Sequence, residues 1–174
     1  MAAEKYAYGI AKVEYGTPAG TATMPVSMTQ WAQTVEGSFT LSEDESQTKD
    51  FKVEEVTTPV KSIVTEAGSL KIKWRAYDIT PSLVAIMKGG TAGTEAGPPA
   101  YLTYDGPTSV AAKDLALRIT TTNGVIFNIY KAACVGRFDG SLSRTDLLEM
   151  EVSATVLDPG NAGSPYEIKL PNPS

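Results

Sequence analysis

Hydrophobic and polar residues alternate with a period of two along several segments, which predicts strands with one buried face. The clearest segments are residues 69–77 and 147–157. In the first, one face carries Leu70, Ile72, Trp74 and Ala76, and the other carries Lys71, Lys73 and Arg75. In the second, one face carries Leu148, Met150, Val152, Ala154 and Val156, and the other carries Glu149, Glu151, Ser153 and Thr155.

Weaker alternation predicts further strands, joined by short turns. They are expected at residues 9–15, 33–41, 51–55, 60–64, 110–122, 125–130 and 132–138. Residues 43–46 are expected to form a turn that returns the chain from the second of these strands to the third. Asn123 and Gly124 separate two strand-like runs, and this dipeptide predicts a hairpin with a type I′ turn. A second turn is expected at residues 139–140.

One segment changes to the period of a helix. Thr80 supplies a hydroxyl for the N-cap, and Pro81 fits the first helical position, where its missing N–H is not needed. Three apolar residues then recur at i, i+3 and i+4: Leu83, Ile86 and Met87. Gly89 and Gly90 end the segment, because glycine readily adopts a left-handed conformation. A single helix of about ten residues is expected here.

Residues 91–109 show no period and are rich in glycine and proline, so we expect a long loop that is functional or mobile. Residues 160–174 contain three prolines and are expected to form a C-terminal extension. The chain is therefore expected to be a single domain over residues 1–174, with a β-rich core at 9–159. We predict a mainly-β fold, an antiparallel sandwich or barrel with one flanking helix and long loops.

Composition removes several kinds of chemistry. The 174 residues include no histidine, the commonest general base and metal ligand, and one cysteine. A Ser-His-Asp arrangement, a disulfide within the chain and a multi-thiolate zinc site are thus excluded. The formal net charge of −5 opposes nucleic-acid binding through phosphate contacts and opposes attachment to anionic membranes. Met1 to Gly9 lacks the apolar stretch of a signal peptide, so we expect a protein made in a reducing cytosol.

The remaining candidate sites are better explained as structure. Cys134 lies in an apolar run with no histidine to activate it, which indicates a structural thiol. The acidic residues 43–45 lack the spacing of a calcium loop, and residues 89–93 lack the lysine of a phosphate-binding loop. Glu149 and Glu151 share one strand face, which is expected to be polar and exposed. We therefore predict no catalytic residue, no cofactor and no metal site.

Two stretches near the C-terminus carry a family resemblance. Residues 133–143, Ala-Cys-Val-Gly-Arg-Phe-Asp-Gly-Ser-Leu-Ser, and residues 147–159, which begin Leu-Leu-Glu-Met-Glu-Val, resemble the closing strands of tailed-bacteriophage major tail tube proteins. The helix that starts at Thr80 and the opening strand at residues 9–15 also lie where that family has such elements. The long segment 91–109 is the part that departs from the shared layout.

The resemblance implies a structural virion protein of the phage tail, assembled in the host cytoplasm and without enzymatic activity. Six copies would form a ring by pairing strands, and rings would stack with other tail proteins into a tube through which DNA passes without specific binding. If Glu149 and Glu151 face the lumen, they would form rings of negative charge that repel phosphate; the alternative is that this face lies on the outside. Residues 91–109 and the termini would be contacts between subunits.

Two other functions are consistent with the residues. A carbohydrate-binding or adhesin-like β-sandwich would need exposed aromatic residues, for which Trp31 and Tyr104 are the candidates, whereas Trp74 is expected in the core. A small hydrolase is disfavoured by the missing histidine.

Overall fold

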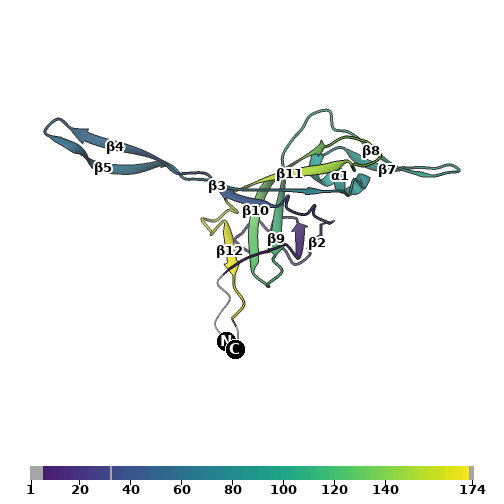
Figure 1. Ribbon diagram of the computed structural model, residues 1–174, viewed down its shortest axis with the longest axis horizontal. Coiled ribbons are helices and arrows are strands. Elements are labelled where there is room, and N and C mark those ends of the chain that lie inside the picture. Colours follow the sequence, from purple (N-terminus) through teal and green to yellow (C-terminus); the bar gives the residue numbers. More distant parts are fainter. Residues whose placement is uncertain (1–5, 32, 173–174) are drawn as a thin grey trace.

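The computed structural model describes residues 6–31 and 33–172, and its largest part is an antiparallel sheet of eight strands (Figure 1). Seven strands lie in the order β2-β1-β9-β10-β11-β6-β3. Their bounds are β1 Lys12–Gly16, β2 Thr29–Gln30, β3 Thr40–Glu43, β6 Leu70–Ala76, β9 Lys113–Thr120, β10 Ile126–Asp139 and β11 Glu149–Val156. The eighth strand, β12 (Tyr166–Lys169), pairs with β10.

The long strand β10 holds this sheet together. Along one edge it pairs with β9, and along the other it pairs first with β12 and then with β11. Ile129 lies opposite Leu117 and Ala132 opposite Leu115, so Tyr130 and Lys131 together face a single residue of β9. This bulge adds one residue to β10, and the apolar side chains on both sides of it therefore stay on the same face.

One face of the sheet forms the core. The strand predictions for residues 69–77, 110–122, 132–138 and 147–157 are confirmed in their central parts. The buried face predicted for residues 69–77 and 147–157 is confirmed as well. The buried side chains include Ile72, Trp74, Leu115, Leu117, Ile119, Ile129, Cys134, Met150, Val152 and Ala154. Burial of these side chains on one face fixes the register, since a shift by one residue would turn them to solvent.

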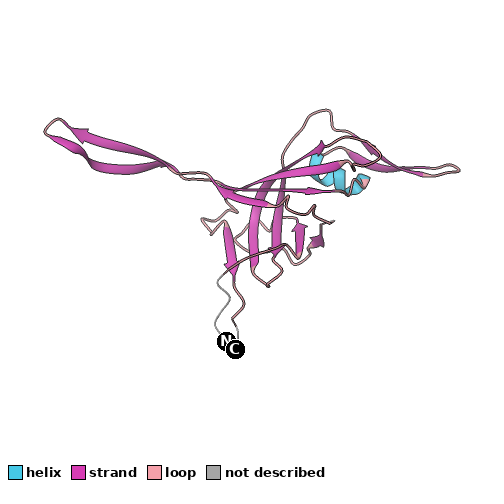
Figure 2. Ribbon diagram, in the orientation of Figure 1, coloured by secondary structure: helices cyan, strands magenta, loops and turns pink. Residues whose placement is uncertain are grey.

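The single helix, α1 (Pro81–Lys88), covers part of this face, and Figure 2 shows it beside the sheet. Leu83, Val84 and Met87 are buried, and Gly89 ends the helix at φ +77°. Thr80 occupies the N-cap position as predicted, but its hydroxyl donates to Asp78 and caps no helical N–H. The helix has eight residues, slightly fewer than expected.

Two hairpins project from the sheet to opposite sides (Figure 1). The longer one consists of β4 (Gln47–Val53) and β5 (Val56–Glu66), and every residue of both strands is exposed. The shorter one consists of β7 (Thr91–Glu95) and β8 (Tyr101–Asp105) and begins directly after α1.

The longer hairpin corrects the predictions for residues 33–66. The expected turn at 43–46 does not return the chain. Instead the chain leaves the sheet there, turns at Glu54 and Glu55, and comes back as the 11-residue β5, which contains the short strand predicted at 60–64. The strand expected at 33–41 is limited to β3 and one bridge from Thr34 to Ala76, because Gly37 at φ +71° interrupts the extended backbone.

The shorter hairpin and β12 correct two further predictions. Residues 91–109 were expected to be a loop, but most of them form β7 and β8. Alternation of hydrophobic and polar residues marks a strand only where one face is buried. All ten strand residues of this hairpin are exposed or half-exposed, so their sequence shows no such alternation. The C-terminal extension likewise contains β12, which adds to the large sheet.

The turn between β9 and β10 is a hairpin connection, as predicted, but of another type. The Thr121 N–H donates to Val125 O, and the Gly124 N–H donates to Thr121 O. Gly124 has φ +83°, while Asn123 is not among the residues of positive φ. A type I′ turn needs positive φ at both central residues, so this is a three-residue loop with glycine in the left-handed position.

The mainly-β, antiparallel fold with one helix is confirmed. The strands form one large sheet and two hairpins, and no barrel closes within residues 6–31 and 33–172. In the same part of the chain no helix has the length and apolar character needed to cross a bilayer.

The contact between α1 and the sheet predicts the effect of a small substitution. A Cβ at Gly136 would lie 2.9 Å from Met87 Cβ and 3.3 Å from Met87 backbone atoms, so the helix would have to shift. We expect Gly136→Ala to lower the free energy of unfolding by about 1–3 kcal/mol, measured by urea denaturation. The control is Gly106→Ala, where a Cβ meets no atom within 4 Å and little loss is expected. Equal stability of the two variants would contradict this packing.

Candidate assembly surfaces

The face of the sheet opposite the core is polar and carries ion pairs between neighbouring strand positions. Those on or beside it are Lys12–Glu14, Lys71–Asp44, Arg75–Glu149, Arg75–Glu151, Lys131–Asp114, Arg137–Glu151 and Lys169–Glu167. Opposite charges directly across an antiparallel pair stabilise the pairing of strands. Each carboxylate in these pairs therefore has a cationic partner on or beside this face.

Glu149 and Glu151 lie on this face, as the sequence predicted. The side chains are 19% and 14% exposed, which is less than a free surface carboxylate would show. Arg75 Nη1 lies 3.2 Å from Glu149 Oε2, and Arg75 Nε lies 3.7 Å from Glu151 Oε2. Arg137 Nη2 lies 2.8 Å from Glu151 Oε1.

The two arginines come from the strands on either side of β11. Arg137 of β10 and Arg75 of β6 both lie opposite Glu151 in the strand register. The nearby carboxylates in turn raise the pKa of Arg75, through the hydrogen bond to Glu149 first. In the single chain the two glutamates are thus paired with cations from the neighbouring strands.

A second polar cluster joins β12 to β10. The Glu167 carboxylate accepts hydrogen bonds from Asn128 Nδ2 at 3.1 Å and from the Tyr130 hydroxyl at 3.3 Å. Asn128 is 2% exposed, and its Oδ1 accepts from Arg118 Nε at 3.0 Å. The hydrogen bond from Asn128 and the charge of Lys169 lower the pKa of Glu167. This cluster fastens the C-terminal strand to the sheet.

The β4–β5 hairpin presents apolar side chains to solvent. Phe51, Val53, Val56, Val60, Ile63 and Val64 are each between 39% and 62% exposed. The sequence pattern predicted two short strands here and no exposed apolar surface. The sequence does contain a signal for this surface, because apolar residues occupy both odd and even positions between 51 and 64. The turn of the hairpin was not recognisable, because Glu54 and Glu55 are not typical turn residues.

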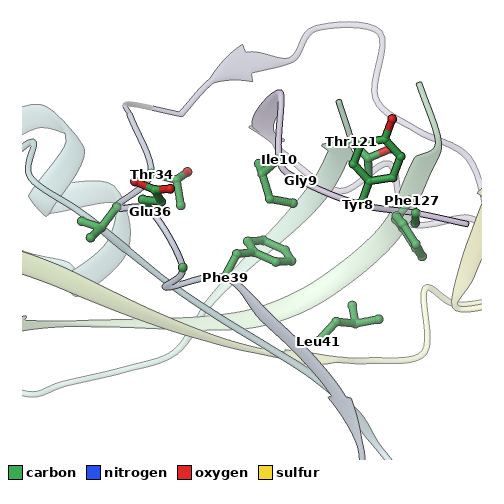
Figure 3. Close-up of a pocket in the computed structure, with 12 residues that line it drawn as sticks. Tyr8, Gly9, Ile10, Thr34, Glu36, Phe39, Leu41, Thr121 and Phe127 are labelled. Atoms are coloured by element: carbon green, nitrogen blue, oxygen red, sulfur yellow. The ribbon is translucent and has the colours of Figure 1, made fainter. Parts of the chain in front are cut away.

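An open pocket of about 620 Å³ lies on the core side of the sheet, between the segment before β1 and the segment leading into β3 (Figure 3). Ile10, Phe39, Leu41 and Phe127 supply apolar walls, and Glu36 lies on its rim. Leu41 is 44% exposed, so the sheet face is incompletely covered at this edge. The lining consists mainly of apolar side chains and offers few groups for chemistry.

The other candidates from the sequence have structural surroundings. Cys134 is fully buried, and burial raises its pKa to about 12, so the thiolate is disfavoured. Asp44 accepts a hydrogen bond from Ser69 and pairs with Lys71 at 2.6 Å, contacts that lower its pKa, the one to Lys71 most. Gly89 and Gly90 follow α1 at positive φ and end it. No group of three His, Cys, Asp or Glu residues that could hold a metal occurs in the described part of the chain.

The aromatic residues proposed for carbohydrate binding are not presented to solvent. Trp31 is 2% exposed and makes edge-to-face contacts with Trp74 at 5.6 Å and Tyr15 at 5.7 Å between ring centroids. Tyr104 is half-buried and donates its hydroxyl to Gly89 O at 2.9 Å. Trp74 lies in the core, as expected. These residues therefore give no support to the carbohydrate-binding alternative.

The exposed apolar side chains of the β4–β5 hairpin are of the kind that marks a site of association with another molecule. A family model described as Phage tail tube protein matches residues 8–167, most of the sequence, and the chain belongs to this family. The resemblance seen in the sequence is thereby confirmed. A search of curated proteins found no significant match. The protein is a structural component of the virion tail that assembles with itself and with other tail proteins.

The Glu167 cluster predicts a dependence of stability on pH. Because the folded state lowers the pKa of Glu167, its contribution is fully present above the unfolded pKa of about 4.3 and is lost as the pH falls through the folded value. We expect the urea midpoint of the wild type to fall between about pH 5 and pH 3, and Glu167→Gln to fall less over that window. Glu54→Gln, in the exposed turn of the hairpin, is the control and should follow the wild type. Parallel curves for all three proteins would contradict this role.

Proposed function

We propose that this chain acts as a single non-enzymatic domain, assembles into hexameric rings in the host cytoplasm, and forms by ring stacking a tube through which DNA passes. Membership of the phage tail tube protein family supports the role of a tube subunit. The number of six copies per ring is what the resemblance to this family implies. The observation that carries the proposal is the β4–β5 hairpin, whose apolar side chains project into solvent with no cover in the single chain. An exposed apolar surface of this kind marks a site of protein association.

Rings can close through the edges of the large sheet. β3 and β2 are its two end strands, and each pairs with one neighbour in the single chain. An open edge offers backbone N–H and C=O groups to a strand of another chain. If the β3 edge of one copy contacts the β2 edge of the next, the contact is heterologous. Such contacts form a closed ring when the rotation that relates successive copies adds up to a full turn.

The polar face with Glu149 and Glu151 is proposed to line the lumen. Ion pairs with Arg75 and Arg137 compensate these carboxylates, so the wall would neither bind phosphate strongly nor carry a large negative field. Compensated charge thus replaces simple repulsion as the reason why DNA would slide past this surface.

The β7–β8 hairpin and the C-terminal segment are proposed as further contacts between subunits. Tyr101 and Leu102 of the hairpin are 58% and 67% exposed, and Ile168 and Leu170 near the C-terminus are about half exposed. These apolar groups are the kind that association buries.

Removal of the longer hairpin tests the proposal. The Asp44 N–H donates to Ser69 O at 3.1 Å, so these residues already form the last rung between β3 and β6. Replacing residues 45–68 by Asn-Gly would close this rung with a two-residue turn. We expect this variant to keep the thermal unfolding midpoint of the body but to remain monomeric, whereas the wild type forms rings and tubes.

Sedimentation and negative-stain electron microscopy at matched concentrations measure this difference. A wild type that stays monomeric at high protein concentration would refute the tube proposal. Tubes formed by the shortened variant would show that the hairpin is not the assembly element.

The lumen assignment has its own test. Glu149→Gln with Glu151→Gln would leave Arg75 and Arg137 uncompensated, and a lumen wall would become cationic. We expect tubes of this variant to retain DNA, with affinity that falls steeply as salt increases. The control is Glu36→Gln with Glu45→Gln, which changes the net charge equally but lies off this face. DNA retention equal to that of the control, measured by co-sedimentation with intact tubes, would place the polar face outside the lumen.

A further inference from the structure

An apolar groove lies where the core face of the large sheet is left uncovered. The pocket of about 620 Å³ (Figure 3) shares Leu41 and Phe127 with a smaller cavity of about 200 Å³ that extends to β12, and together they form this groove. Ile10, Phe39 and Phe127 are half-buried against the core. Leu41 and Ile168 are 44% and 47% exposed. The groove therefore continues the core beyond what the single chain covers, and an apolar surface of this kind marks a site of association.

An acidic side chain lies beside the apolar residues of the groove on β3. Leu41 and Glu43 are two positions apart, so both point to the same side of the strand. Glu43 lines the smaller cavity together with Leu41, and it is exposed. It forms no ion pair with any residue of the described part of the chain. Charge complementarity therefore favours an occupant that carries a cation beside an apolar side chain.

The loop between β10 and β11, residues 140–148, carries this combination. Leu142 and Leu147 are 84% and 65% exposed. Arg144 lies between them in the sequence, is exposed, and has no ion-pair partner within residues 6–31 and 33–172. Leu142 and Arg144 are two positions apart, which is also the spacing of the apolar and the acidic residue on β3.

The same loop already has a defined shape in the single chain. Ser143 Oγ accepts hydrogen bonds from the backbone N–H of Thr145 at 3.2 Å and from that of Asp146 at 3.0 Å. The Ser143 hydroxyl donates in turn to the Asp146 carboxylate at 2.9 Å. These contacts hold the backbone in a turn and engage the acidic group of the loop. A surface that is ordered before it binds loses less conformational entropy on association.

The β7–β8 hairpin is a poorer match for this groove. It exposes Tyr101 and Leu102, but it carries Glu95 and Asp105 and has no lysine or arginine between residues 91 and 105. Its acidic groups would be repelled by Glu43, whereas Arg144 of the loop would be attracted.

We infer that the loop of residues 140–148 docks into the groove of a second copy of this chain, with Leu142 beside Leu41 and Arg144 paired with Glu43. The inference rests on the proposed function and names one contact within that assembly. A second copy is the expected occupant because tail tube proteins assemble with themselves and because the chain carries both complementary surfaces.

The positions of the two surfaces assign this contact to the stacking of rings. Phe127 of the groove is the second residue of β10, and the loop follows the last residue of the same strand, so the two surfaces lie at opposite ends of β10. A contact between two different surfaces of successive copies is heterologous and can repeat. Ring closure through β2 and β3 would run across the strands, whereas this contact extends along them.

Cross-linking between two kinds of chain tests the contact. Leu142→Cys and Leu41→Cys replace exposed side chains, and Cys134 is fully buried, so the introduced cysteines are the accessible thiols. Tubes assembled from equal parts of the two variants and the wild type would be treated with a short bis-maleimide. We expect covalent dimers from this mixture and none from either variant assembled with the wild type alone. Mixed tubes that yield no more dimers than these controls would overturn the inference.

Charge reversal gives a second measurement on Arg144 and Glu43. Like charges brought together at a contact are unfavourable, so Arg144→Glu and Glu43→Arg should each raise the protein concentration needed for tubes by at least roughly tenfold. Rings of both variants should form as in the wild type, because ring closure uses other surfaces. The chain with both substitutions restores opposite charges and should form tubes like the wild type, and so should the conservative variant Arg144→Lys.

The possible results separate this contact from the proposed function. Normal tubes from the single variants, or no recovery in the double variant, would refute the pairing of Arg144 with Glu43. Loss of rings together with tubes in the single variants would contradict the assignment to stacking. Wild-type chains that form neither rings nor tubes would instead refute the proposed function.

Discussion

Burial of one face of the large sheet is the constraint on which the other features depend. Side chains from β6, β9, β10 and β11 meet there, and the bulge in β10 keeps Ile129 and Ala132 on the same side although they are three positions apart along the chain. Because the core uses this one face, the opposite face meets solvent and must be polar. The helix α1 covers only part of the core face. The two hairpins extend beyond the area that the core can cover. The features proposed for assembly thus lie where the core ends.

The net negative charge of the chain is distributed unevenly as a result. On the polar face, carboxylates such as Glu149 and Glu151 are matched by arginines from the adjacent strands. Acidic residues in the hairpins, such as Glu54, Glu55 and Glu95, have no ion pair within the described part of the chain. A functional argument from charge therefore has to be made surface by surface.

The same constraint explains which predictions from the sequence succeeded. Residues 70–76 and 149–156 alternate because one of their faces is buried, so both the strands and the facing of Glu149 could be predicted. The hairpins have no buried face, and their strands were predicted only in part. In the longer hairpin the pattern predicted strands at residues 51–55 and 60–64 alone, and the shorter hairpin was predicted as a loop. The partners of Glu151 come from positions far away in the sequence, and pairing between such strands is set by the tertiary register. Local pattern could reveal the orientation of a side chain but not its neighbours.

The longer hairpin also contains features that limit unwanted pairing. An exposed strand with apolar residues is a template for aggregation, and natural proteins counter this with charges, prolines and bulges. In β5, residues 57–60 lie opposite Lys52 alone, and Pro59 in this irregular stretch has no N–H to offer to another strand. Lys49 and Lys61 flank Phe51 on one face. Indiscriminate pairing along the strand edge is therefore disfavoured, while the apolar side chains on the faces remain available. This combination is consistent with the proposed role of the hairpin as an assembly element, because its edges resist pairing while its side chains stay exposed.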